Sequence, residues 1–151
     1  MKRKLSVFLD AVMAISCALP CQPHHRGVSP RITVTNNSSV PVALDVTYTS
    51  VDLSKLPGAA WGIGPNVASN EIAIGFQPET LANQMPTTFN QTTWLQANTQ
   101  QNVNVMSLNA YGNSTMYVVG TLGDAVPENN SFSVIPTFVV RQAWPVHIIT
   151  Q

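Results

Sequence analysis

Two cysteines and two histidines near the N-terminus are the residues whose types could hold a metal ion. Cys17 and Cys21 are followed closely by His24 and His25, and thiolate with imidazole suits zinc or copper. Their spacing matches no closed zinc motif, and the Pro- and Gly-containing run around them is typical of a solvated tether. The sequence therefore predicts no metal site and no cofactor.

Catalytic chemistry has little support in the residue pattern. His147 is the one remaining histidine, and no carboxylate or nucleophile stands near it in sequence. A partner brought close by folding, such as Asp45, Glu71 or Asp124, stays open. The glycines at 58, 62 and 64 precede no expected helix, so they do not form a phosphate-binding loop. We expect a protein that is not an enzyme, with a hydrolase as the remaining alternative.

The three tryptophans are the candidate ligand-binding side chains. Trp61 lies in a long Gly- and Pro-containing stretch, whereas Trp94 and Trp144 lie in or beside expected strands. Exposed aromatic rings stack on sugars or touch lipid surfaces, so Trp61 is the strongest of the three candidates. The competing interpretation is that each indole anchors its loop onto the core.

The first 18 residues have the layout of an export leader. The basic run Met1–Lys4 is followed by an apolar stretch over residues 5–15, which Asp10 interrupts. Cleavage could follow Ala18, or Cys17 could be the lipidated residue of a degenerate bacterial lipobox. We expect an exported protein, either tethered to the bacterial envelope through Cys17, periplasmic, or secreted. The alternative is a retained amphipathic helix in a cytosolic protein.

Composition limits the classes of partner. Hydrophobic residues make up 44% and charged residues 9% of the 151-residue chain, so a globular core is expected and long solvated helices are not. From Cys17 onward, four basic residues against six acidic ones leave a net charge of −2. Phosphate neutralisation needs a basic patch, so nucleic acid is excluded as a partner.

Alternation of apolar and polar residues predicts strands throughout. Residues 40–50 give the clearest pattern, with Val42, Leu44, Val46 and Tyr48 on one face. Further strands are expected at 31–35, 71–76, 92–97, 102–109, 115–122, 132–140 and 145–150. The apolar phase shifts within 102–109, which predicts a β-bulge. Pro136 places its strand at a sheet edge or a bulge.

About eight short strands separated by Gly, Pro and Asn turns predict an all-β fold, an antiparallel β-sandwich of Ig-like or jelly-roll type. We expect a leader over 1–18, a flexible tether over 19–30 and a single domain over 31–151. A sheet edge poor in charge can accept a partner strand. The leading hypothesis is a structural or recognition module that contacts another protein through a sheet edge or loops. The alternative is a carbohydrate- or lipid-binding sandwich that uses Trp61.

Overall fold

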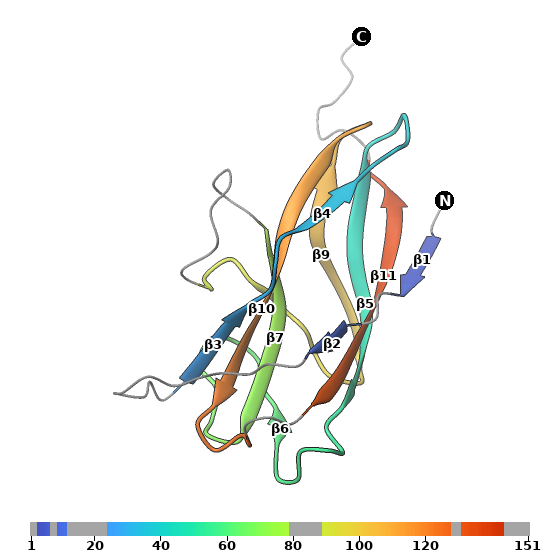
Figure 1. Ribbon diagram of the computed structural model, residues 1–151. Helices are drawn as coiled ribbons and strands as arrows, with labels where there is room; N and C mark the ends of the chain where they lie inside the picture. Colours follow the sequence, from blue (N-terminus) through green and yellow to red (C-terminus); the bar gives the residue numbers. More distant parts are fainter. Residues whose placement is uncertain (1–2, 7–8, 12–23, 79–88, 128–130, 144–151) are drawn as a thin grey trace.

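The computed structural model describes residues 3–6, 9–11, 24–78, 89–127 and 131–143, and these form strands, turns and irregular loops in two packed sheets (Figure 1). No helix occurs among them, which confirms the predicted all-β sandwich. The strands, in chain order, are β1 (Arg3–Ser6), β2 (Leu9–Ala11), β3 (His24–Val28), β4 (Ile32–Thr35), β5 (Val42–Asp52), β6 (Ala60–Trp61), β7 (Glu71–Pro78), β8 (Thr93–Trp94), β9 (Gln100–Leu108), β10 (Asn113–Gly123) and β11 (Phe132–Gln142).

The first sheet is built on three long antiparallel strands in the order β11, β5, β9. On the other edge of β11 lie the short strands β1 and β2, both within the range that the sequence predicts as a leader, and they pair with it on either side of Ile135 and Pro136. Proline has no N–H to give to a strand ladder, so it is tolerated where pairing on one side is interrupted.

The second sheet has β10 at its centre. β7 pairs with one edge of β10, and β3 and β4 pair one after the other along the opposite edge. The short strands β6 and β8 extend the sheet beyond β7, with β6 parallel to it. The range 24–28, where the sequence predicts a flexible tether, is thus the sheet strand β3.

The main core lies between the two sheets. Phe76 of β7 and Phe138 of β11 meet there with ring centroids 5.4 Å apart, and both are almost fully buried. A smaller apolar cluster covers the outer face of the second sheet, where Phe89, Tyr117 and Val119 are buried. Two buried layers instead of one explain why β10 is apolar on both faces.

The regular alternation expected along β5 breaks after Val46. Val46 is opposite Phe138 and Tyr48 is opposite Thr137, so Thr47 has no counterpart on β11. This extra residue reverses the facing of the strand beyond it: Thr49 is fully buried, whereas Tyr48 is 37% exposed. The prediction that Tyr48 shares the apolar face of Val42, Leu44 and Val46 is therefore wrong.

The bulge predicted within residues 102–109 is confirmed. On β9, Met106 is opposite Leu44 and Asn104 is opposite Asp45, which leaves Val105 without a counterpart on β5. The extra residue lets Val105 and Met106, although adjacent in the chain, both lie buried in the main core.

Candidate functional site

An open cleft of about 510 Å³ lies at one end of the sandwich, between β4 of the second sheet and the strand ends of the first. The segment between β4 and β5 forms its lip, at the upper end of the molecule in Figure 1. Its aliphatic lining residues are Val34, Val40, Val42, Leu44, Leu108 and Val140. Val34, Val42 and Val140 pack against the main core and yet stay half-buried, so the cleft is a place where the core is incompletely covered.

The rim of the cleft carries hydrogen-bonding side chains with a single charge among them. The polar lining residues are Thr35, Asn36, Asn37, Ser38, Arg141 and Gln142. An aliphatic interior with a mostly uncharged polar rim suits an apolar group presented on a polar backbone.

Asn36 holds the lip in place. Its side chain is 6% exposed and its amide donates to the carbonyl oxygens of Val40 (2.8 Å) and Asn109 (2.9 Å). Its side-chain oxygen accepts from the backbone N–H (3.0 Å) and the hydroxyl (2.7 Å) of Ser38. One buried amide thus ties the β4–β5 segment to the β9–β10 turn, and the shape of the rim depends on it.

Tyr111 stands on that β9–β10 turn beside the lip. Its backbone N–H donates to the carbonyl of Ser38 at 3.0 Å, its φ is 57°, and it is 71% exposed. A left-handed backbone costs a non-glycine residue about 1–2 kcal/mol. Val40, on the lip itself, is 37% exposed. The lip therefore exposes a valine that lines the cleft, and the neighbouring turn exposes an aromatic ring.

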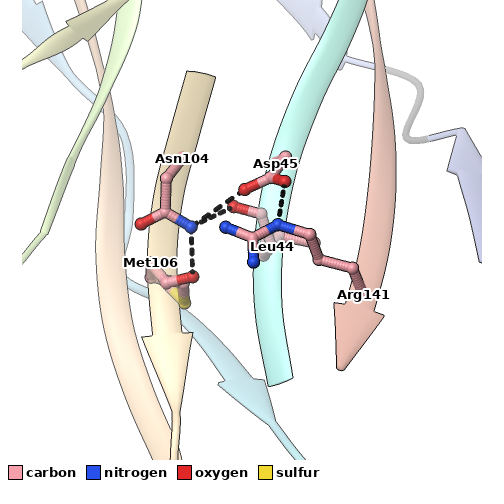
Figure 2. A network of polar contacts seen from close by, with 5 residues as sticks. All are labelled: Leu44, Asp45, Asn104, Met106 and Arg141. Carbon is pink, nitrogen blue, oxygen red and sulfur yellow. Dashed lines mark hydrogen bonds and ion pairs between the residues drawn. The ribbon is translucent and has the colours of Figure 1, made fainter. Parts of the chain in front are cut away.

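Arg141 borders the cleft and is held by a polar cluster on the outer face of the first sheet (Figure 2). Its Nε donates to a carboxylate oxygen of Asp45 at 2.6 Å. Asn104 donates to the other oxygen at 2.9 Å and also to the carbonyls of Leu44 (3.4 Å) and Met106 (3.2 Å). Asp45 therefore joins all three long strands, and Asn104 donates to carbonyls of β5 and β9 at the β9 bulge.

Comparison with models of known protein families, with curated proteins and with solved structures finds no match for this chain.

Two of the three candidate tryptophans lie in the described part of the chain, away from the cleft. Trp61 is half-buried against the main core, and its indole N–H donates to the carbonyl of Leu95 at 2.8 Å. Trp94 packs against the smaller cluster, with its ring edge-on to Phe89 at 6.3 Å. The guanidinium of Arg26 lies 5.6 Å from the centre of the Phe89 ring. Both indoles have the contacts of loop anchors.

The other candidate residues are placed only in part. Cys17, Trp144 and His147 lie outside the described residues, as does the proposed cleavage site after Ala18. His24 and His25 belong to β3, opposite Gly123 and Leu122. The described residues include no group of three or more His, Cys, Asp or Glu side chains that could hold a metal ion. They also include no helix long and apolar enough to cross a membrane.

The sequence leaves three carboxylates open as partners of a catalytic histidine. These residues, Asp45, Glu71 and Asp124, lie on three separate elements. Asp45 pairs with Arg141 on the outer face of the first sheet. Glu71 begins β7 and accepts a long hydrogen bond of 3.5 Å from the Ala68 N–H, and Asp124 is exposed in the turn after β10.

The sequence did not identify Asn36 or Tyr111 as site residues. The sequence predicts turns at Asn36-Asn-Ser-Ser, which lies in the irregular connection between β4 and β5, and at Tyr111-Gly-Asn-Ser, of which Asn113 and Ser114 already belong to β10. For Tyr111 the sequence does contain a signal, because a Tyr in a turn of otherwise small polar residues has no role in forming that turn.

Proposed function

We propose that this chain is a non-enzymatic recognition module that binds a protein partner through the cleft and the exposed residues beside it. The observation that carries the proposal is the aliphatic cleft between the sheets, which Val40 of the lip lines and beside which the exposed Tyr111 stands on the turn bonded to Ser38. Aromatic side chains next to an apolar pocket are typical anchors of protein interfaces.

The size of the apolar surface favours a protein over a small molecule. A cleft of about 510 Å³ is large enough for a small ligand, but such a ligand would leave the exposed Tyr111 ring beside the lip uncovered. Tyr111 is 71% exposed and Val40 is 37% exposed. An extended chain segment covers both the cleft and the lip, and its backbone can hydrogen-bond to the uncharged rim.

The proposed setting is the bacterial cell envelope or the exterior. The support is the basic start Met1–Lys4, the apolar stretch 5–15 and the small residues around Cys17. Release after Ala18 and lipid attachment at Cys17 are separate forms of this proposal, and either one removes β1 and β2 from the edge of β11. The intact mass of the protein made with its native leader distinguishes the two forms. A diacylglyceryl increment on a chain that starts at Cys17 means a tethered module.

Site-specific photo-crosslinking tests the binding site. A photoreactive amino acid replaces Tyr111 in one full-length chain and Ile63 in the matched control. Ile63 is 57% exposed and lies beside β6, at the opposite end of the sandwich from the lip (Figure 1). We expect a protein adduct from position 111 and not from position 63, and its loss when V40D is added. Equal adducts from both positions, or none from position 111, would contradict the proposal.

A further inference from the structure

We infer that the cleft receives residues 144–151 of a second copy of this chain, so that copies associate head to tail. This inference rests on the proposed function, since it names the protein segment that the cleft binds. It draws on three observations: the chemistry of residues 144–151, the edge of β4 that pairs with no other described strand, and the place where the described chain reaches residue 143.

The chemistry of residues 144–151 matches that of the cleft. The run Trp-Pro-Val-His-Ile-Ile-Thr-Gln contains no Asp, Glu, Lys or Arg. Val146 and Ile148 are two apart, so they share a face when the segment is extended. The cleft has aliphatic walls and one charged rim residue, Arg141, whose guanidinium is already bonded to Asp45. Neither side therefore places an unpaired charge against the other.

β4 offers a backbone edge beside the cleft. Ile32–Thr35 pairs with β10 along one edge, and the described residues supply no strand to its other edge. Val34 and Thr35 of this strand line the cleft. A segment that adds to β4 as a strand gains backbone hydrogen bonds and directs alternate side chains into the cleft.

The position of residue 143 favours a second copy over the same chain. The backbone N–H of Ala143 donates to the carbonyl of Pro41 at 2.9 Å, which keeps the chain in line with β11 as far as the rim. With residue 143 held in line with β11, we assign the following segment to the cleft of a second copy. Eight extended residues reach about 26 Å, which is enough to enter the cleft of a neighbouring molecule. A head-to-tail contact of this kind leaves a free cleft and a free segment at the two ends of each assembly.

Complementation between two inactive variants tests the inference. Full-length chains carrying C17S, which prevents lipid attachment, are compared by sedimentation over a range of concentrations. I148D inactivates the inserting segment and keeps the cleft. V34D inactivates the cleft and keeps the segment. V40D also inactivates the cleft, and because Val40 is exposed on the lip, this substitution leaves the packing of the main core unchanged. T150D and I63D are the matched controls for the segment and for the domain surface.

The unchanged chain and both controls are expected to show a weight-average mass that rises at least about twofold with concentration. I148D, V34D and V40D are each expected to stay monomeric. A mixture of I148D with V34D or V40D restores one good interface, so it forms a dimer that grows no further. An unchanged chain that stays monomeric, or mixtures that form no dimer, would overturn the inference. If the chain stays monomeric while V40D still abolishes the crosslink from position 111, the cleft binds another protein and the proposed function stands alone.

Discussion

Arg141 donates its Nε–H to the carboxylate of Asp45 at 2.6 Å, and this contact joins β11 to β5 on the outer face of the sheet whose inner face lines the cleft. The side chain of Asp45 is 18% exposed and that of Arg141 is 43% exposed. The contact is therefore partly screened by solvent, and its role is to hold the strand ends beside the rim.

A double-mutant cycle with D45N and R141Q measures this contact. We expect a coupling free energy of about 0.5–1 kcal/mol in chemical unfolding, because half-exposed ion pairs contribute little. The coupling should shrink as salt is raised. The cycle of R141Q with D52N is the control, since distant charges are expected to add independently. A coupling above about 3 kcal/mol would show that the pair behaves as a buried one.

Substitution of Asn36 separates the lip from the rest of the fold. N36A leaves the carbonyls of Val40 and Asn109 without their donor, and we expect the free energy of unfolding to fall by about 2–3 kcal/mol. N37A is the matched control: Asn37 is the exposed neighbour, so a change within about 0.5 kcal/mol is expected. Urea unfolding of the two variants gives the comparison. Equal losses would mean that the network of Asn36 does not hold the lip.

The strands were predictable because burial on one face leaves a period-two pattern, which the first half of β5 shows, and because large and small residues alternate in β7, which is buried on both faces. The bulge in β9 was predictable for the same reason, since Val103 and Val105 change phase to Met106 and Leu108. The bulge in β5 was not. Thr47 and Thr49 are the same residue type, and the sequence does not distinguish the unpaired threonine from the buried one.

The cleft was beyond prediction because it arises from pairing between distant segments. Val34 and Val140 look like ordinary core residues in the sequence, and only the position of β4 against β10 leaves them half-covered. The error for Trp61 has the opposite direction: its sequence neighbours suggest an exposed ring, whereas the indole is anchored in the structure. Trp61 stands among glycines and prolines, which suggests exposure, yet the carbonyl of Leu95 accepts its indole N–H.

The pKa of Asp52, at the far end of β5, tests which neighbouring groups stabilise its ionised carboxylate. Hydrogen bonds from the Ser54 hydroxyl and backbone N–H, with a smaller contribution from Lys55, hold the pKa of Asp52 below its ordinary value of 3.8. Because the folded pKa is lowered, the stabilisation is present above the unfolded value and is lost as pH falls through the folded one. In an NMR titration, S54A should raise this pKa more than K55M does. The reverse order would make Lys55 the main cause.

Substitution of Thr49 tests whether the β5 bulge lowers the free energy of unfolding. The bulge turns this side chain into the core opposite Pro136, where it is fully buried and its hydroxyl has no hydrogen-bond partner. T49V keeps the shape and removes the unpaired hydroxyl, so we expect the free energy of unfolding to rise by about 1–2 kcal/mol. T47V is the same substitution at the half-buried bulged residue, whose hydroxyl makes only a long contact of 3.5 Å with the carbonyl of Thr137. It should change stability by less than about 0.5 kcal/mol. If T49V instead lowers the free energy of unfolding, the Thr49 hydroxyl is hydrogen-bonded in solution. The bulge in β5 would then not bury an unpaired hydroxyl.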